Sequence, residues 1–267
     1  MAFLKITFVS LITLYILVGL GVYFLQEKLI FLPEELDKDF SYDFPAEFEE
    51  HFLEMEDGGV INVLHFKSDS SKGLILYFHG NAGSLRRWGD VTLPFVDKGF
   101  DVLIMDYRGY GKSTGSRTYQ TLLSDADRLY KFALDRTSED QLIVFGRSLG
   151  SSFASYLAGK NNPSKLILET PFLSLGDMAN RVAPIYPPSY FLRFNFKNHK
   201  SLEGAKCPIY IFHGTEDNVV PLESAQKLYD TLDPNQAQLF IIEDGGHNDL
   251  SGFTRYNEEL SKILGSE

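Results

Sequence analysis

Short runs of consecutive apolar residues recur through the middle and the C-terminal part of the chain, and polar or turn-forming residues separate them. Runs of this length are typical of strands that are buried on both faces of a parallel sheet. The strands predicted in this way are residues 60–67, which partly alternate, and then residues 74–78, 102–105, 142–145, 166–168, 209–212 and 239–242.

Segments with apolar residues three or four positions apart lie between the later runs and predict helices. The predicted helices are residues 119–134, 149–159, 222–232 and 253–264. Strands that alternate with helices indicate βαβ units, and hence a mostly parallel sheet with helices packed on it. We therefore predict one α/β domain over residues 29–267.

Residues 171–206 interrupt this alternation. They are too rich in proline for one regular helix and too aromatic for a solvated loop. The prolines and aromatic residues in question are Pro184, Pro187, Pro188, Tyr186, Tyr190, Phe191, Phe194 and Phe196. We predict a small cap over a pocket, and the alternative is an excursion that only completes the core. The acidic residues 34–50 have the composition of a connecting segment.

The N-terminal part of the chain carries no charged residue between positions 6 and 25. Such a stretch of about 20 residues forms a helix about 30 Å long, enough to cross the hydrocarbon core of a bilayer. The alternatives are a cleaved signal peptide and a buried helix. A signal peptide has a shorter apolar region that ends in a small-x-small site, whereas this stretch ends in Tyr23-Phe24-Leu25. We predict an uncleaved single-pass anchor over residues 1–28.

Charge and composition narrow the function further. The net charge of -11 should repel nucleic acid and anionic lipid surfaces, so a nucleic-acid function is not expected. Lys5 on one side of the anchor, with Glu27 and Lys28 on the other, slightly favours a catalytic domain outside the cytoplasm. The only cysteine, Cys207, has no partner for an internal disulfide or a metal site, and we expect a small buried hydrophobe there. The sequence does not indicate an oligomeric state.

The main chemical signal is Gly146-Arg147-Ser148-Leu149-Gly150, which follows a predicted strand and precedes a predicted helix. A serine hydroxyl is a weak nucleophile, so it must be presented on a sharp turn within reach of a base. The two glycines allow that turn without side-chain clashes. We predict Ser148 as the nucleophile and expect Arg147 to support the turn from outside the pocket.

A second glycine-containing loop, residues 79–83, follows the predicted strand 74–78. Backbone N–H groups in such a loop can face a developing oxyanion. We predict an oxyanion hole made by the N–H groups of Asn81 and Leu149, and a structural role for His79 in binding backbone. The alternative for this loop is an ordinary strand-to-helix turn.

Two further strand ends supply an acid and a base. Asp217 follows the predicted strand 209–212, and the adjacent Glu216 is its competitor for the role of the acid. His247 follows the predicted strand 239–242 in a loop with two glycines. The chain order Ser148, Asp217, His247 favours His247 as the base over the other histidines.

The chain resembles the α/β-hydrolase superfamily, and more narrowly its membrane-anchored Bem46-like branch, which is similar to the mammalian ABHD proteins that deacylate lipids or proteins. The resemblance covers residues 30–264 approximately and is specific for fold and triad but not for substrate. It is carried by His79-Gly80-Asn81-Ala82-Gly83, Asp106-Tyr107-Arg108-Gly109-Tyr110-Gly111, Gly146-Arg147-Ser148-Leu149-Gly150, Glu169-Thr170-Pro171-Phe172, His213-Gly214-Thr215-Glu216-Asp217 and Gly246-His247.

These observations predict a serine hydrolase that cleaves ester or thioester bonds of an acyl-group substrate, from lipid or acylated protein, through an acyl-enzyme. We expect no metal and no organic cofactor, because no ligand spacing indicates one. A serine peptidase and a catalytically silent binding protein are the alternatives. We expect Asp106 and Arg108 to bond to neighbouring loops, and Glu169 either to line the site or to bond to backbone.

Overall fold

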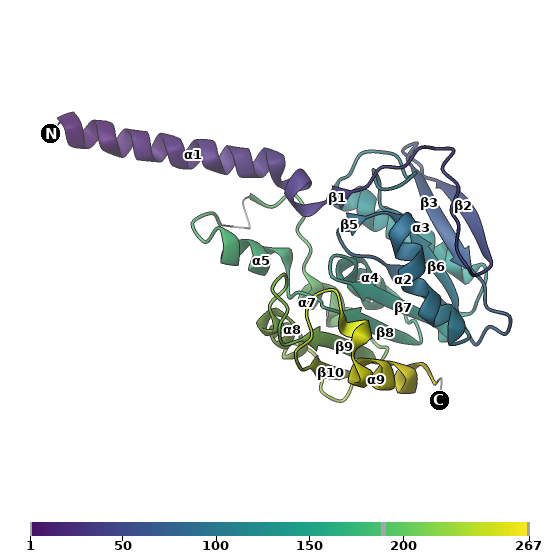
Figure 1. The fold of residues 1–267 in the computed structure, drawn as a ribbon. Coiled ribbons are helices and arrows are strands. Elements are labelled where there is room, and N and C mark those ends of the chain that lie inside the picture. Colours follow the sequence, from purple (N-terminus) through teal and green to yellow (C-terminus); the bar gives the residue numbers. More distant parts are fainter. Residues whose placement is uncertain (1, 188–190, 266–267) are drawn as a thin grey trace.

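A computed structural model describes residues 2–187 and 191–265 (Figure 1). The predicted cap residues Pro188 and Tyr190 lie outside the described part of the chain. Most of the chain builds an eight-stranded sheet with helices on both faces. The strand order is β10-β9-β8-β7-β4-β6-β3-β2, and two very short strands, β1 and β5, pair separately.

The strands of the main sheet are β2 (Phe48–Glu54), β3 (Val60–Phe66), β4 (Leu74–Phe78), β6 (Asp101–Met105), β7 (Leu142–Arg147), β8 (Lys165–Glu169), β9 (Ile209–Gly214) and β10 (Ala237–Ile242). All pairings from β10 to β6 are parallel, and β3 and β2 are added antiparallel at one edge. The prediction of a mostly parallel sheet is therefore confirmed. Every residue of β4 is buried, which is why this segment reads as one apolar run in the sequence.

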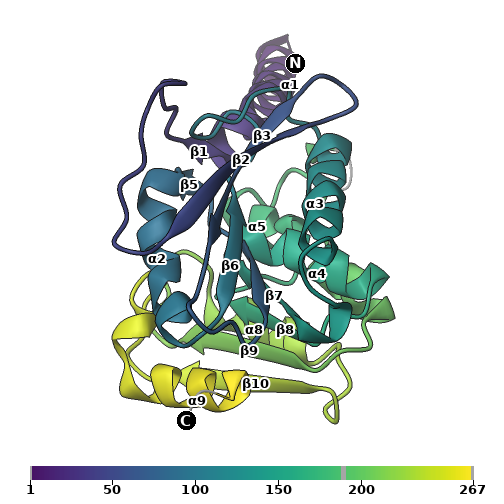
Figure 2. The ribbon, with the colours of Figure 1, turned by 90° about the vertical axis from the view of Figure 1, so that its right-hand side faces the viewer.

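The helices are α1 (Ala2–Ile30), α2 (Leu85–Asp97), α3 (Tyr119–Leu134), α4 (Gly150–Lys160), α5 (Leu175–Val182), α7 (Asn198–Ser201), α8 (Leu222–Tyr229) and α9 (Thr254–Leu264). Helices α2 and α9 share one apolar cluster with the sheet, and α3, α4 and α8 share the other, on the opposite face (Figure 2). Three short 3-10 turns, Glu139–Gln141, Leu202–Gly204 and Leu250–Gly252, complete the described elements.

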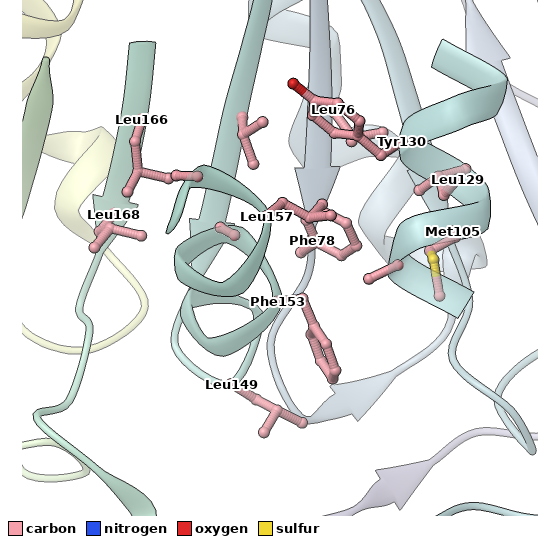
Figure 3. Packing of buried hydrophobic residues seen from close by; sticks show 14 of the residues in the cluster. Leu76, Phe78, Met105, Leu129, Tyr130, Leu149, Phe153, Leu157, Leu166 and Leu168 are labelled. Atoms are coloured by element: carbon pink, nitrogen blue, oxygen red, sulfur yellow. The ribbon is translucent and has the colours of Figure 1, made fainter. Parts of the chain in front are cut away.

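Helix α4 fixes the nucleophile segment against the centre of the sheet. It packs on β7, and its Phe153 contacts Phe78 of β4 with ring centroids 5.8 Å apart. Figure 3 shows Phe153 and Leu157 of α4 beside Phe78 of β4, and Leu149 at the start of the helix. Since these residues are almost fully buried, the start of α4 has a rigid support.

Besides short elements such as β1 (Leu32–Pro33), β5 (Ala82–Gly83), α5 and α7, one longer strand and one longer helix were not predicted. Strand β2 occupies residues whose first part reads as a polar connection, because an edge strand buries only part of its side chains. Helix α2 has an amphipathic pattern that is interrupted by Pro94 within the helix. All the strands and helices that were predicted are present, with ends that differ by a few residues.

Helix α1 extends beyond the domain and exposes most of its side chains (Figure 1). The helix has 29 residues, and its most apolar window has a mean hydropathy of 2.3. It is therefore long and apolar enough to cross a membrane. It ends at Ile30, two residues beyond the predicted end of the anchor at residue 28.

The described part of residues 171–206 packs against α1 and the core. The ring of Tyr186 stacks on Tyr15 of α1 with centroids 4.7 Å apart, and its hydroxyl donates to the Tyr15 carbonyl at 2.9 Å. Gln26, which is buried near the end of α1, donates to the carbonyl of Phe191. Phe194 and Phe196 belong to the main core. This arrangement supports the alternative of a packed excursion for these residues.

Candidate active site

Four loops at one edge of the sheet hold the residues that the sequence singles out. Asn81 follows β4, Ser148 follows β7, Asp217 follows β9 and His247 follows β10. These strands are parallel, so their carboxyl ends meet at the same edge, where ligands bind in open α/β sheets. The topology therefore brings together residues that lie far apart in the sequence.

Ser148 adopts the left-handed backbone conformation, with φ of 51°, between β7 and α4. This conformation is strained for a residue with a side chain and is typical of a functional turn. The flanking glycines are required for space. A Cβ on Gly150 would lie 2.0 Å from the carbonyl oxygen of Phe78, and one on Gly146 would lie 2.6 Å from the Cβ of Ala154. Only glycine at both positions allows the serine to sit this close to the sheet.

The three predicted triad side chains form one hydrogen-bonded chain. Oγ of Ser148 lies 3.0 Å from Nε2 of His247, and Nδ1 of His247 lies 2.7 Å from Oδ2 of Asp217. A carboxylate only accepts hydrogen bonds, so Nδ1 carries the proton and Nε2 is free to accept the proton of the serine. This geometry meets the requirement for a nucleophile, its base and an orienting acid.

Asp217 is held as a carboxylate. Burial by itself would raise its pKa, but hydrogen bonds from His213 and His247 and from the N–H of Val220 outweigh burial, so that the pKa lies well below its usual range. The N–H of Val219 also donates to Oδ1, at 2.8 Å. The competing Glu216 is exposed and makes none of these contacts.

Two backbone N–H groups close to Ser148 have no acceptor in the described part of the chain. Within residues 2–187 and 191–265, neither the N–H of Asn81 nor that of Leu149 donates to a protein acceptor. Gly80 and Asn81 line the same pocket as Ser148, and Leu149 begins the first turn of α4. Unpaired donors next to a nucleophile are what an oxyanion hole needs.

The pocket at Ser148 has a volume of about 270 Å³. Its lining residues are Leu32, Gly80, Asn81, Ala82, Arg87, Trp88, Arg147, Ser148, Val219, His247 and Asn248. Leu32 and Val219 are 51% and 57% exposed, so the pocket has an apolar rim that is open to the surroundings. No described residue of 171–206 lines it, which leaves the predicted cap without a described contact at this pocket.

Arg147 lines the pocket, so its expected position outside the pocket is wrong. Its Nε lies 3.0 Å from Oε1 of Glu169, and its NH2 donates to the carbonyl of His247 at 3.3 Å and to Oδ1 of Asn248 at 3.1 Å. The other carboxylate oxygen of Glu169 accepts from the hydroxyl of Tyr256. Glu169 thus bonds to side chains, and neither expectation for it holds. Sequence reasoning missed Asn248 and Tyr256, although Asn248 directly follows the base.

Asp106, Arg108 and His79 have structural contacts, as expected, although Asp106 and Arg108 bond to residues of helices α2 and α3 as well as to a loop. Asp106 is buried and accepts from the N–H of Leu85 at 3.1 Å. Arg108 donates to the carboxylates of Asp125 and Asp57 at 2.7 and 2.6 Å. Nδ1 of His79 lies 2.7 Å from the carbonyl oxygen of Gly80. Cys207 is buried, as predicted for a small hydrophobe.

One group of residues has a ligand set that a metal ion could use. Ligand atoms of Glu49, His51 and His65 all lie within 4.8 Å of one another, on the edge strand β2 and its neighbour β3. The ammonium group of Lys67 already pairs with Glu49. Strands β4 and β6 separate this group from the nucleophile strand β7, so it has no part in the chemistry at Ser148.

Two family models match parts of this chain. The description "Serine aminopeptidase, S33" belongs to a family model that matches residues 69–194, and the dienelactone hydrolase family matches residues 168–259. Among curated relatives, the protein bem46 of Schizosaccharomyces pombe is 28% identical over 266 residues, which cover 93% of this chain and 89% of that protein.

A second relative has a named activity. The lysophosphatidylserine lipase ABHD12 of Danio rerio is 33% identical over 183 residues, or 60% of this chain. This chain spans about half the length of that relative, 47%. Among solved structures, the Pyrococcus furiosus esterase Pf2001 superposes with a TM-score of 0.68 at 20% identity and covers 88% of this chain and 96% of that one. This likeness confirms the predicted fold.

Proposed function

Because this chain belongs to the α/β-hydrolase superfamily, we propose that it is a membrane-anchored serine hydrolase of carboxylic ester or thioester bonds. The observation that carries the proposal is the chain of contacts from Ser148 Oγ through His247 to Asp217, at 3.0 and 2.7 Å. The relatives named as a lipase and an esterase are consistent with this chemistry.

In the first half of the reaction, Oγ of Ser148 attacks the carbonyl carbon of the substrate while Nε2 of His247 takes its proton. The ionised Asp217 stabilises the imidazolium that forms and keeps the ring oriented. The carbonyl oxygen becomes an oxyanion and accepts from the N–H groups of Asn81 and Leu149. When the tetrahedral intermediate collapses, His247 gives its proton to the leaving alcohol or thiol, and the acyl group stays on Ser148.

In the second half, a water molecule replaces the leaving group beside His247. The imidazole takes a proton from this water, and the resulting hydroxide attacks the acyl carbonyl. The same two N–H groups stabilise the second oxyanion. Collapse returns the proton to Ser148 Oγ and releases a carboxylic acid.

The rim of the pocket supports an acyl substrate with a polar head group. Leu32 and Val219 expose apolar surface where an acyl chain could lie, and Leu32 lies two residues after the end of the anchor helix. Arg87 lines the same pocket, with its guanidinium 5.3 Å from the centroid of the Trp88 ring. We propose single-chain acyl lipids with an anionic head group as the first substrates to test, and acylated proteins as the second.

The proposal is tested on the full chain in detergent with a fluorophosphonate probe. We expect stoichiometric labelling of the parent protein and no labelling of Ser148→Ala. A folded parent protein that takes up no probe would contradict the proposal and favour an anchored binding protein. Hydrolysis of anionic and neutral monoacyl lipids by the parent and by Arg87→Ala then measures the contribution of the cationic rim.

A serine peptidase is the second candidate, and the match to the S33 aminopeptidase family supports it. Cleavage of a peptide bond needs the same nucleophile and oxyanion hole, and an aminopeptidase also needs a subsite for the free amino group of its substrate. Aminoacyl amides assayed beside acyl esters separate the two functions. If the protein hydrolyses only the amides and Ser148 still reacts with the fluorophosphonate, the proposed function is a peptidase and not an esterase.

A further inference from the structure

The residues that connect α1 to the domain run directly over the proposed oxyanion loop. We call residues 31–36 the junction segment. Its strand β1 (Leu32–Pro33) pairs in parallel with β5 (Ala82–Gly83), which belongs to the loop that contains Asn81. These two strands form a separate sheet of their own, and a ladder this short is marginal without other support. The loop is therefore held by the junction segment together with domain residues such as Tyr110 and Trp88.

The contacts converge on Asn81. Its carbonyl oxygen accepts from the N–H of Leu32 at 2.9 Å and from the hydroxyl of Tyr110 at 2.6 Å. Its side-chain Nδ2 donates at 3.2 Å to the carbonyl of Ile30, the last residue of α1. Two residues further along, the N–H of Glu34 donates to the carbonyl of Gly83 at 3.0 Å. Residues from the anchor helix and from the junction segment thus hold the residue that supplies the proposed oxyanion donor.

These bonds complete a two-sided support of the Asn81 N–H. On one side, the carbonyl of Gly80 accepts from Nδ1 of His79 at 2.7 Å. That carbonyl and the N–H of Asn81 belong to the same trans peptide group and point in opposite directions, so this bond directs the N–H away from His79. On the other side, Leu32 and Tyr110 hold the next peptide group through its carbonyl. Both peptide groups around the Asn81 Cα are therefore fixed.

The junction segment is itself held by the domain. Phe31 is buried, and its ring meets Phe194 with centroids 4.9 Å apart. In the last turn of α1, Glu27 pairs with Nε of Arg117 at 3.1 Å. The exposed side chain of Leu32 lines the pocket at the same time. Through these contacts, the position of the loop beside Ser148 depends on the position and orientation of the end of α1.

We propose that the junction segment is a positioning element of the oxyanion hole, which makes the rate of acyl transfer depend on how the end of the membrane anchor docks on the domain. The inference rests on the proposed function, because it assigns the Asn81 N–H to the oxyanion. Leu32 and Tyr110 act through Asn81 and are positioning residues.

The first test compares Leu32→Pro with Leu32→Ala in the full chain in detergent. Proline removes the N–H that donates to Asn81, whereas alanine keeps it, and both variants lose the leucine side chain from the pocket rim. Loss of a whole oxyanion donor lowers kcat by about 100- to 1,000-fold, so a displaced donor should lower kcat of Leu32→Pro by about 10- to 100-fold relative to Leu32→Ala. We expect KM to be the same in both variants within about twofold, because the donor acts on the transition state.

The second test uses Tyr110→Phe, which removes one hydroxyl and leaves the buried ring. The matched control is Tyr130→Phe, whose hydroxyl donates to Glu139 at the opposite end of the sheet. We expect only Tyr110→Phe to weaken inhibition by a trifluoromethyl ketone, which forms an oxyanion on Ser148. The increase in its inhibition constant should match the decrease in kcat/KM for the corresponding ester.

The outcomes separate the two proposals. If the parent protein neither reacts with a fluorophosphonate nor hydrolyses esters, the proposed function fails. The inference alone is overturned if the parent is active, Leu32→Pro and Leu32→Ala have the same kcat, and Tyr110→Phe and Tyr130→Phe have the same inhibition constant for the trifluoromethyl ketone. If Leu32→Pro shows no cooperative thermal transition and therefore does not fold, the comparison of Tyr110→Phe with Tyr130→Phe tests the inference by itself.

Discussion

Arg147, the residue before the proposed nucleophile, donates at 3.1 Å to the side chain of Asn248, the residue after the proposed base. This contact joins the loop after β7 to the loop after β10. The same guanidinium is paired with the buried Glu169, so its position is well determined. The relationship explains how two loops that share no backbone pairing can hold Ser148 and His247 at hydrogen-bonding distance.

The role of this contact can be separated from the role of the ion pair. Asn248→Ala removes the contact and leaves the pair between Arg147 and Glu169. Because a small displacement of a catalytic group lowers rates strongly, we expect kcat to fall by about tenfold while the melting temperature is nearly unchanged. Arg147→Met should also destabilise the fold by about 3–5 kcal/mol, because it removes the cation that pairs with the buried carboxylate of Glu169 and leaves that charge with only the hydrogen bond from Tyr256. Equal kcat values for Asn248→Ala and the parent would contradict this role.

Asp217→Asn tests the orienting acid. An amide can donate to Nδ1 of His247 and so favour the wrong tautomer, which costs about 10⁴-fold in kcat in a comparable triad. We expect a decrease of that order with little change in KM. The matched control is the neighbouring Glu216→Gln, which alters an exposed carboxylate and should leave kcat unchanged. A larger effect at Glu216 than at Asp217 would reverse the assignment.

The lowered pKa of Asp217 predicts a pH dependence of stability. A group whose pKa is lower in the folded protein stabilises the fold above the pKa of the unfolded chain, about 3.9 for aspartate, and this stabilisation is lost as the pH falls towards the folded value. We therefore expect the parent protein to be more stable than Asp217→Asn at neutral pH, with a difference that narrows below about pH 4. Melting temperatures of both proteins from pH 3 to pH 8 measure it. If the stability difference between the parent and Asp217→Asn widens on acidification, the ionised Asp217 does not stabilise the fold.

Cys207 should be chemically silent in the folded protein. Burial raises the pKa of its thiol to about 11, so the reactive thiolate is scarce at neutral pH and is also inaccessible. We expect a maleimide to leave the native protein unmodified at pH 7.5 and to modify one thiol per chain after unfolding in guanidinium chloride. Rapid labelling of the native protein would mean that the β9 region opens readily.

The closeness of the nucleophile turn to β4 predicts the effect of one methyl group. In Gly150→Ala the added Cβ would lie 2.0 Å from the carbonyl oxygen of Phe78, so that the turn must shift. We expect loss of fluorophosphonate labelling and a destabilisation of about 1–3 kcal/mol. Gly252→Ala is the control, because nothing lies within 4 Å of a Cβ there. Normal labelling of Gly150→Ala would show that the turn tolerates displacement.

The amino-acid sequence alone determined the parallel sheet and the residues of the candidate site. Residues 74–78 and 142–145 are buried on both faces, so that their apolar runs are visible without knowledge of any partner. Loops after such strands share one sheet edge, and the order of Ser148, Asp217 and His247 along the chain could therefore be interpreted as one site.

Only the tertiary structure decided which surfaces meet. Strand β2 is specified by its antiparallel pairing with β3, and the positions of Arg147 and Glu169 depend on each other across two loops. The junction segment is a short apolar run whose bonds to Asn81 have no local signature in the sequence. Periodicity reports whether a side chain is buried, whereas hydrogen bonds between distant segments depend on the three-dimensional path of both.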